Sequence, residues 1–129
     1  MLDADVVIAG ERGVFNLEDW LTSRGGETFC LAAVTVAELL HGLERATPPH
    51  RARREAFLSR LLSGCEVLPY TRSTAAIHAR IWAALEASGQ MAGAHDLLVA
   101  ATALENDLPV ATFNTRHFRS IEGLRIIEP

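Results

Sequence analysis

The segment Met1–Gly10, MLDADVVIAG, decides the fold, because two acids interrupt a run of β-branched and apolar residues. The run predicts a short strand that leads into a turn or a helical start. A carboxylate inside such a run must lie near the end of the element or be paired, since burial of a lone charge is costly. If the segment stays extended, Asp3 and Asp5 project from one face; if a helical turn begins after Asp3, they diverge.

The rest of the chain alternates short apolar segments with helical patterns. Strands are expected at 28–33, 65–69, 109–112 and 124–127. Helices are expected at 15–24, from 35 up to the Pro48-Pro49 pair, and at 50–62, 73–88 and 96–106, with a turn at 115–118. This alternation predicts an α/β fold with a mainly parallel sheet. Ligands of such sheets collect at the carboxyl ends of the strands, so we expect the chemistry there.

The composition is that of one globular domain over residues 1–129, with 49% hydrophobic and 22% charged residues. No apolar run approaches the ~20 residues of a membrane span, and the N-terminus lacks the basic region of a secretory signal. These features predict a cytoplasmic protein. Cys30 and Cys65 are then expected to be reduced core residues rather than a disulfide.

All 12 basic residues are arginines, and five of them lie between Arg45 and Arg60. The absence of lysine excludes any chemistry that needs a lysine amine. Guanidinium groups bind phosphate in a bidentate way, so the arginines suit phosphate recognition although the net charge is −4. The alternative is that the arginine content reflects only the base composition of the genome.

Four acids stand at expected strand ends or helix starts: Asp3, Asp5, Glu38 and Asp96. In a parallel α/β fold these places converge on one edge of the sheet. Carboxylates gathered in one cleft repel each other, and a hard divalent cation relieves that repulsion. Because no cysteines or histidines have metal-binding spacing, Mg²⁺ or Mn²⁺ is the expected ion.

These acids also have purely structural explanations. Thr35 and Glu38 fit a capping box, in which the Glu38 side chain would reach back to the Thr35 amide. Asp96 fits an ordinary N-cap, and Asp5 fits a first-turn acid favoured by the helix dipole. The residues alone leave both explanations open.

Four motifs together resemble those of the PIN-domain ribonucleases, specifically the VapC-type toxins of bacterial toxin–antitoxin pairs. They are LDADVVI at 2–8, VTVAELLHG at 34–42, GAHDLLVAA at 93–101 and ATFNTRHF at 111–118, followed by a closing strand, GLRII, at 123–127. The resemblance spans almost the whole chain. It implies a single PIN-like domain over residues 1–129, with a three-layer α/β/α fold and a mainly parallel central sheet of four to five strands.

By this resemblance, Asp3, Glu38 and Asp96 are the catalytic, metal-binding acids. Asp5 and Thr112 fall on positions that support the site.

The chain departs from the family pattern at two positions. Asn114 stands where the family has a fourth acid, so we expect it to be a supporting residue. His117 stands where a further acid is common. The resemblance therefore leaves open whether one or two ions bind. His95 and His117 are of interest only because they lie next to other motif residues in the sequence.

The resemblance implies an endoribonuclease, in which a bound Mg²⁺ or Mn²⁺ activates the attacking water and the product carries a 5′-phosphate. Its substrate would be structured RNA such as tRNA or rRNA. Arginines around the cleft, Arg45 and Arg116 among them, would hold the RNA backbone. The implied partners are a VapB-like antitoxin protein and a second copy of the chain in a homodimer.

Two other functions are kept as alternatives. A catalytically inactive PIN-like module that binds RNA or protein is favoured by the missing fourth acid at Asn114. An aspartate-nucleophile phosphatase is suggested by Asp3-Ala4-Asp5-Val6, which matches D-x-D-x-[TV], although such an enzyme needs a lysine that the chain lacks.

Overall fold

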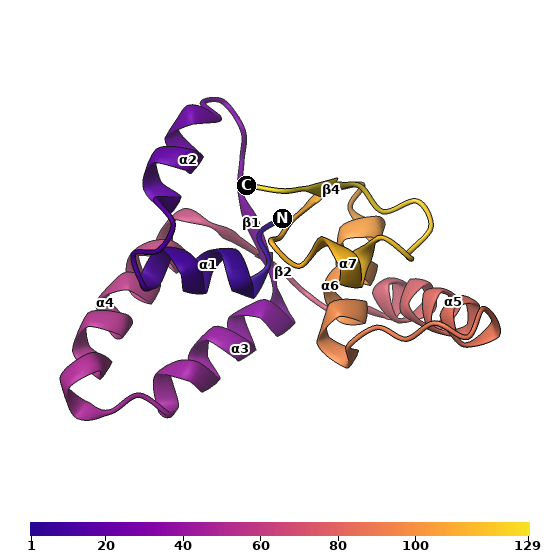
Figure 1. The fold of residues 1–129 in the computed structure, drawn as a ribbon, viewed down its shortest axis with the longest axis horizontal. Coiled ribbons are helices and arrows are strands. Elements are labelled where there is room, and N and C mark those ends of the chain that lie inside the picture. The colour runs from indigo at the N-terminus through magenta and orange to yellow at the C-terminus, as the bar shows by residue number, and fades with distance from the viewer.

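The computed structural model describes all residues from Met1 to Pro129, and Figure 1 shows its helices arranged around short strands. In chain order the elements are α1 (Ala4–Glu11), α2 (Leu17–Ser23), β1 (Cys30–Ala32), α3 (Ala33–Glu44), α4 (Pro48–Gly64), β2 (Glu66–Leu68), α5 (Arg72–Ala87), α6 (Ala94–Glu105), β3 (Val110–Ala111), α7 (Thr115–Phe118) and β4 (Ile126–Ile127). None of the helices combines the length and apolar character that a membrane crossing requires.

Leu2 forms the centre of the sheet by itself. It bridges Leu31 of β1 on one side and Ala111 of β3 on the other, both in parallel. β2 pairs in parallel with β1, and β4 with β3, so the order is β2–β1–Leu2–β3–β4. The Asp3 N–H donates to the Ala111 carbonyl at 3.0 Å, and α1 begins at the next residue. The strand expected at the start of the chain is therefore one bridge residue, and the helical alternative is confirmed.

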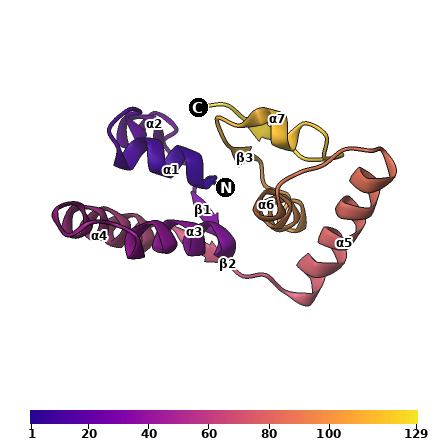
Figure 2. The ribbon, with the colours of Figure 1, turned by 60° about the horizontal axis from the view of Figure 1, so that its bottom comes forward.

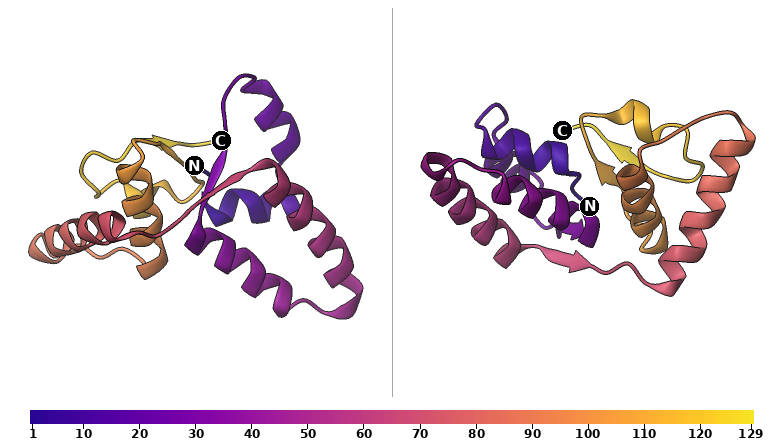
Figure 3. Two further views of the ribbon diagram at one scale, coloured as in Figure 1. Left: turned by 180° about the vertical axis from the view of Figure 1, so that it is seen from behind. Right: turned by 90° about the horizontal axis from the view of Figure 1, so that it is seen from below.

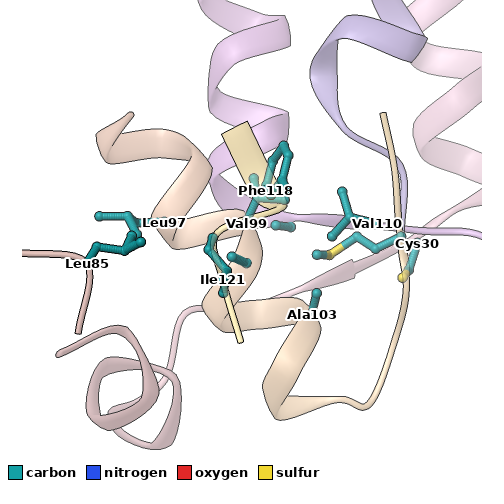
Figure 4. Packing of buried hydrophobic residues seen from close by; sticks show 11 residues of the cluster. Cys30, Leu85, Leu97, Val99, Ala103, Val110, Phe118 and Ile121 are labelled. Carbon is teal, nitrogen blue, oxygen red and sulfur yellow. The ribbon is translucent and has the colours of Figure 1, made fainter. Parts of the chain in front are cut away.

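Apolar side chains fill both faces of the sheet, which gives three layers. Figures 2 and 3 show α1–α4 on one side of the strands and α5–α7 on the other. The buried cluster beneath α1–α4 consists of Leu2, Val7, Leu31, Leu39, Leu43, Leu58 and Ala111. The cluster on the other face gathers around the fully buried ring of Phe118 (Figure 4). The α/β class with parallel strands is confirmed.

Three helices begin two residues earlier than the sequence predicts. α3 begins at Ala33 rather than at residue 35, and α6 begins at Ala94 rather than at residue 96. α4 begins at Pro48, because a proline in the first helical turn needs no amide partner and its φ already suits a helix. The expected turn at 115–118 is one turn of helix, α7.

Contacts with α5 hold α6, the helix that carries Asp96. Glu105, the last residue of α6, accepts a hydrogen bond from Thr71 at 3.1 Å and another from the buried Thr74. The hydrogen bond from Thr74 lowers the pKa of Glu105. One end of α6 is thereby anchored, and its other end lies beside the carboxyl end of β3, because α6 and β3 are consecutive and run in opposite directions.

Both cysteines are free thiols. Cys30 belongs to the cluster beneath α5–α7, whereas Cys65 packs against the cluster on the opposite face of the sheet. Sulfur atoms on opposite faces of a sheet cannot be bridged without moving the backbone. Burial raises the pKa of both thiols, which keeps them protonated.

An ion pair ties α4 to α1 and α3. The Nε and Nη2 atoms of Arg54 lie 3.1 and 3.0 Å from the Glu11 carboxylate, and Nη1 donates to the Gly42 carbonyl at 2.8 Å. The side chains of Glu11 and Arg54 are only 8% and 24% exposed. This member of the arginine-rich segment therefore serves the fold.

We expect Arg54→Ala to lower the free energy of unfolding by roughly 2–3 kcal/mol, because it removes the donor to the Gly42 carbonyl and leaves the mostly buried Glu11 carboxylate with only a 3.9 Å contact to Arg53. Urea denaturation measures the change. Arg51→Ala is the matched control, since Arg51 pairs with Glu44 at 3.1 Å in a more exposed place, where a loss of about 1 kcal/mol or less is expected. An equal loss of unfolding free energy in the two variants would show that the Glu11–Arg54 pair stabilises the fold no more than the exposed Arg51–Glu44 pair does.

Candidate active site

Asp3 is buried where the chain leaves the centre of the sheet. Its Oδ1 accepts a hydrogen bond from the Ala4 N–H at 2.8 Å, so Asp3 is the N-cap of α1. Its Oδ2 accepts from the hydroxyl of Thr112, the residue after β3, at 2.9 Å. Two neighbouring parallel chain segments thus end in side chains that touch, at the edge where parallel sheets bind ligands.

Asp5, in the first turn of α1, holds the segment that follows β3. Its Oδ2 accepts hydrogen bonds from the backbone amides of Phe113 and Asn114, each at 3.0 Å, and lies 3.0 Å from the Thr112 hydroxyl. The carboxylates of Asp3 and Asp5 therefore both contact the Thr112 hydroxyl. The prediction that the two side chains diverge when a helical turn follows Asp3 is wrong. The other Asp5 oxygen, Oδ1, is buried without any hydrogen-bond partner. An unpaired buried oxygen is costly, and it is free to meet a cation.

Burial and the neighbouring charges shift the pKa of Asp3. Burial raises the pKa of Asp3 from 3.8 to about 6, and the charges of Asp5 and, to a smaller extent, Asp96 act in the same direction. The hydrogen bonds from Thr112 and Ala4 oppose the shift. The charges of Asp5 and Asp96 therefore both act against that of Asp3, and a bound cation would relieve this repulsion.

Glu38, on α3, contacts His95, the residue that precedes Asp96 in α6. The predicted capping box is wrong, because α3 begins two residues before Thr35 and its N-cap is Ala32, which makes no side-chain capping bond. Thr35 is fully buried, and its hydroxyl has no partner. Glu38 is thus not needed as a cap; its Oε1 lies 2.7 Å from Nδ1 of His95.

Asp96 stands in the first turn of α6, and its predicted role as N-cap is wrong because Gly93 occupies that position. Its Oδ2 lies 2.8 Å from Nδ1 of His117, and the Asn114 amide nitrogen lies 2.7 Å from the same ring atom. An ionised carboxylate can only accept, so Nδ1 of His117 is the donor to Asp96. The Asn114 side chain thus contacts His117, which in turn contacts Asp96.

The structure brings the predicted metal-binding acids only partly together. Asp3 and Asp96 share one electrostatic environment, whereas the carboxylates of Glu38 and Asp96 are turned toward imidazole rings. No group of three or more histidine, cysteine, aspartate or glutamate side chains is arranged to hold a single ion. The donor set consists of carboxylate oxygens, which suits a hard divalent cation once Glu38 and Asp96 rotate off their imidazole partners.

The two arginines predicted to contact RNA lie at different distances from the acids. Arg116 is exposed on α7 and directly precedes His117, whose ring contacts Asp96. Arg45 is exposed at the end of α3, about 10 Å along the helix from Glu38 at 1.5 Å per residue.

The sequence assigns no role to three residues of the site. His95 and His117 stand out only by their neighbours, and nothing in their spacing predicts which acids they contact. A Cβ atom at Gly93 would lie 2.7 Å from Oδ2 of Asp96, so a side chain there would displace that carboxylate. The position of Gly93, three residues before an acid at a helix start, is the only signal for this role.

Comparison with known proteins identifies the family. The PIN domain family matches residues 1–124. Ribonuclease VapC10 of Mycobacterium tuberculosis is 36% identical over 126 residues, which cover 97% of this chain and 90% of that protein. The tRNA(fMet)-specific endonuclease VapC of Salmonella typhimurium is 38% identical over 114 residues, covering 87% of this chain and 78% of that protein. The crystal structure of DNA-bound VapBC from Salmonella typhimurium aligns with a TM-score of 0.89 at 28% identity, covering 98% of this chain and 95% of the matched one.

With parallel strands, Asp3 and Thr112 in contact at their carboxyl edge, and a family match over nearly its whole length, the chain belongs to the PIN-domain family. Within that family its relatives are VapC proteins, so the resemblance to VapC-type PIN domains is confirmed.

Proposed function

We propose that the protein is a divalent-metal-dependent endoribonuclease and the toxin of a type II toxin–antitoxin pair. The observation that carries this proposal is the cluster of Asp3, Asp5 and Asp96 at the carboxyl edge of the sheet. In this cluster the pKa of Asp3 is about 6 and one buried oxygen of Asp5 has no partner. The names of the relatives, a ribonuclease and a tRNA(fMet)-specific endonuclease, support the proposed reaction.

In this proposal Asp3, Glu38 and Asp96 are the residues that hold Mg²⁺ or Mn²⁺. Such an ion supplies a water molecule of lowered pKa and neutralises charge on the phosphate during in-line hydrolysis. No side chain acts as the nucleophile. As the resemblance implies, the 3′ oxygen would be the leaving group, so that the product carries a 5′-phosphate.

In the metal-free protein a neighbouring side chain holds each of these acids, and Glu38 and Asp96 would exchange their imidazole partners for the ion. The Thr112 hydroxyl holds Asp3, and the imidazoles of His95 and His117 hold Glu38 and Asp96 at 2.7 and 2.8 Å. Arg116, which is exposed beside His117 in the chain, would bind an RNA phosphate through its guanidinium fork. Arg45, farther along α3, would contact the RNA backbone away from the cut.

The proposed substrate is structured RNA, such as tRNA or rRNA, cut where its bases are unpaired. The name of the Salmonella relative supports tRNA as the first candidate. The proposed partner is a VapB-like antitoxin that blocks the cleft, supported by the similar VapBC structure. The resemblance extends the proposal to a homodimer, which sedimentation of the purified protein would test.

Incubation of the purified protein with total tRNA and rRNA tests the reaction. We expect discrete fragments with 5′-phosphate ends in Mg²⁺ or Mn²⁺, no fragments in EDTA, and full recovery when the metal is added back. Cleavage that persists in EDTA would contradict the metal-dependent mechanism.

The second candidate is a catalytically inactive PIN-like module that binds RNA or protein. It is favoured by the lack of three converging ligands and by Asn114 in place of the fourth family acid. RNA binding in a gel shift, with no cleavage in either metal, would support it. The phosphatase alternative loses support, since the matched family is the PIN domain and the chain has no lysine.

A further inference from the structure

Phe113 is a partly exposed aromatic residue next to the acids Asp3 and Asp5. It follows Thr112 directly, and its backbone N–H donates to Oδ2 of Asp5 at 3.0 Å. The residue is 40% exposed. Single exposed apolar side chains are common on protein surfaces, and what distinguishes Phe113 is how its ring is held.

A row of aromatic side chains fixes the ring. Phe113 meets Phe15 edge to face, with ring centroids 5.2 Å apart and an angle of 85° between the planes. Phe15 lies 6.1 Å from Trp20, and Trp20 lies 5.8 Å from Phe29. The Arg24 guanidinium covers Trp20 at 5.0 Å from its centroid. One side of the Phe113 ring is therefore supported while the remainder stays open to solvent.

We propose that Phe113 is the platform on which an unpaired RNA base next to the scissile phosphate stacks. The inference rests on the proposed ribonuclease function and names a specificity-determining residue for it. A phosphodiester bound at the acids brings its flanking nucleotides next to residue 113, because the amide of that residue contacts Asp5 directly. Proteins that read single-stranded RNA stack its splayed-out bases on aromatic side chains of this kind.

The surroundings of the ring favour RNA over a protein segment. The next residues along the chain include Asn114 and the exposed Arg116, so one short segment offers a ring for a base and a guanidinium for a phosphate. A protein segment that packed on Phe113 would need further apolar surface on the same segment, and these polar neighbours do not provide it.

Two variants separate stacking from simple packing. Phe113→Leu keeps an apolar side chain against Phe15 but removes the aromatic face, whereas Phe113→Tyr keeps the ring. The probe is a synthetic RNA hairpin spanning a site that the wild-type protein cuts in total tRNA or rRNA. A matched set of hairpins carries an abasic nucleotide on one side of the cut or the other.

On the intact hairpin we expect Phe113→Leu to raise KM roughly 5- to 150-fold, the range of base–aromatic stacking, with kcat little changed. A KM effect alone is expected because the ring would bind substrate and transition state equally. Phe113→Tyr should restore the wild-type KM. On the hairpin that lacks the stacked base, wild type and Phe113→Leu should have the same KM.

Trp82→Leu is the control for loss of an exposed aromatic ring elsewhere. Trp82 is 53% exposed on α5, where it stacks on His78, and its loss should leave KM unchanged. Thermal unfolding and Mn²⁺ affinity of Phe113→Leu should match those of the wild type, which a structural role for the ring would not allow.

Equal KM values for wild type and Phe113→Leu on the intact hairpin would overturn the inference and leave the ribonuclease function standing. A KM increase of the same size on every abasic hairpin would also overturn it, because the ring would then act without a base. A wild-type protein that cuts no RNA would remove the proposed function, and this inference with it.

Discussion

Asp96→Asn is expected to abolish RNA cleavage while the protein stays folded. The change is nearly isosteric, but it removes a carboxylate charge from the cleft and weakens any bound cation. Loss of several kcal/mol of charge stabilisation corresponds to a rate lower by roughly 10²- to 10⁴-fold. Single-turnover cleavage in Mg²⁺ measures the effect, and circular dichroism with urea denaturation checks the fold.

Asp107→Asn is the matched control for Asp96→Asn. The Asp107 side chain is 97% exposed and pairs only with Arg125, and its φ of 50° is one that asparagine adopts readily. This variant should cleave at the wild-type rate. Metal-dependent cleavage by Asp96→Asn at the wild-type rate would contradict the role of Asp96 as a metal ligand, regardless of the result for the control.

Asp3→Asn is expected to stabilise the metal-free protein above pH 6 and to abolish cleavage at the same time. The pKa of the Asp3 carboxyl is raised from 3.8 to about 6, mainly by burial. The folded protein therefore binds this proton more tightly than the unfolded chain does. Its stability falls as pH rises from about 4 to 6, by about 3 kcal/mol in total from this group. Asparagine removes that penalty and can still cap α1.

Urea denaturation in EDTA at pH 4 and pH 7.5 tests the sign. At pH 7.5 the free energy of unfolding of Asp3→Asn should exceed that of wild type by up to about 3 kcal/mol, and the difference should shrink toward zero at pH 4. A variant that is less stable than wild type at pH 7.5 would mean that the Asp3 charge is well compensated without a cation. The expected repulsion in the cleft would then be absent.

The α/β class and the motif acids are predictable from the sequence because both depend on local patterns. Short apolar segments alternate with helical ones. Asp3 and Thr112 lie together at the carboxyl ends of parallel segments, which is where parallel sheets bind their ligands. The orientation of Asp5 was not predictable. A strand reduced to the single residue Leu2 could not be told from a longer one, and the Thr112 hydroxyl that joins both acids is remote in sequence.

The partners of the other acids depend on tertiary packing. His95 lies 57 positions from Glu38, and His117 lies 21 positions from Asp96, so only the packing of α3, α6 and α7 brings them together. The capping box failed for a local reason, since Ala32 already has the extended conformation of an N-cap and α3 starts directly after it. Sequence propensity placed that boundary two residues too late.

The measurement that tests the account most directly is calorimetric titration of the wild-type protein with Mn²⁺ at pH 6, in two buffers of different ionisation enthalpy. We expect one saturable site that is lost in Asp3→Asn and in Asp96→Asn. We also expect release of about half a proton per ion, because a carboxyl with a pKa of about 6 is half protonated at that pH and must ionise to bind metal. A titration without saturable heat, or binding that survives unchanged in both variants, would contradict the claim that these acids form a metal site.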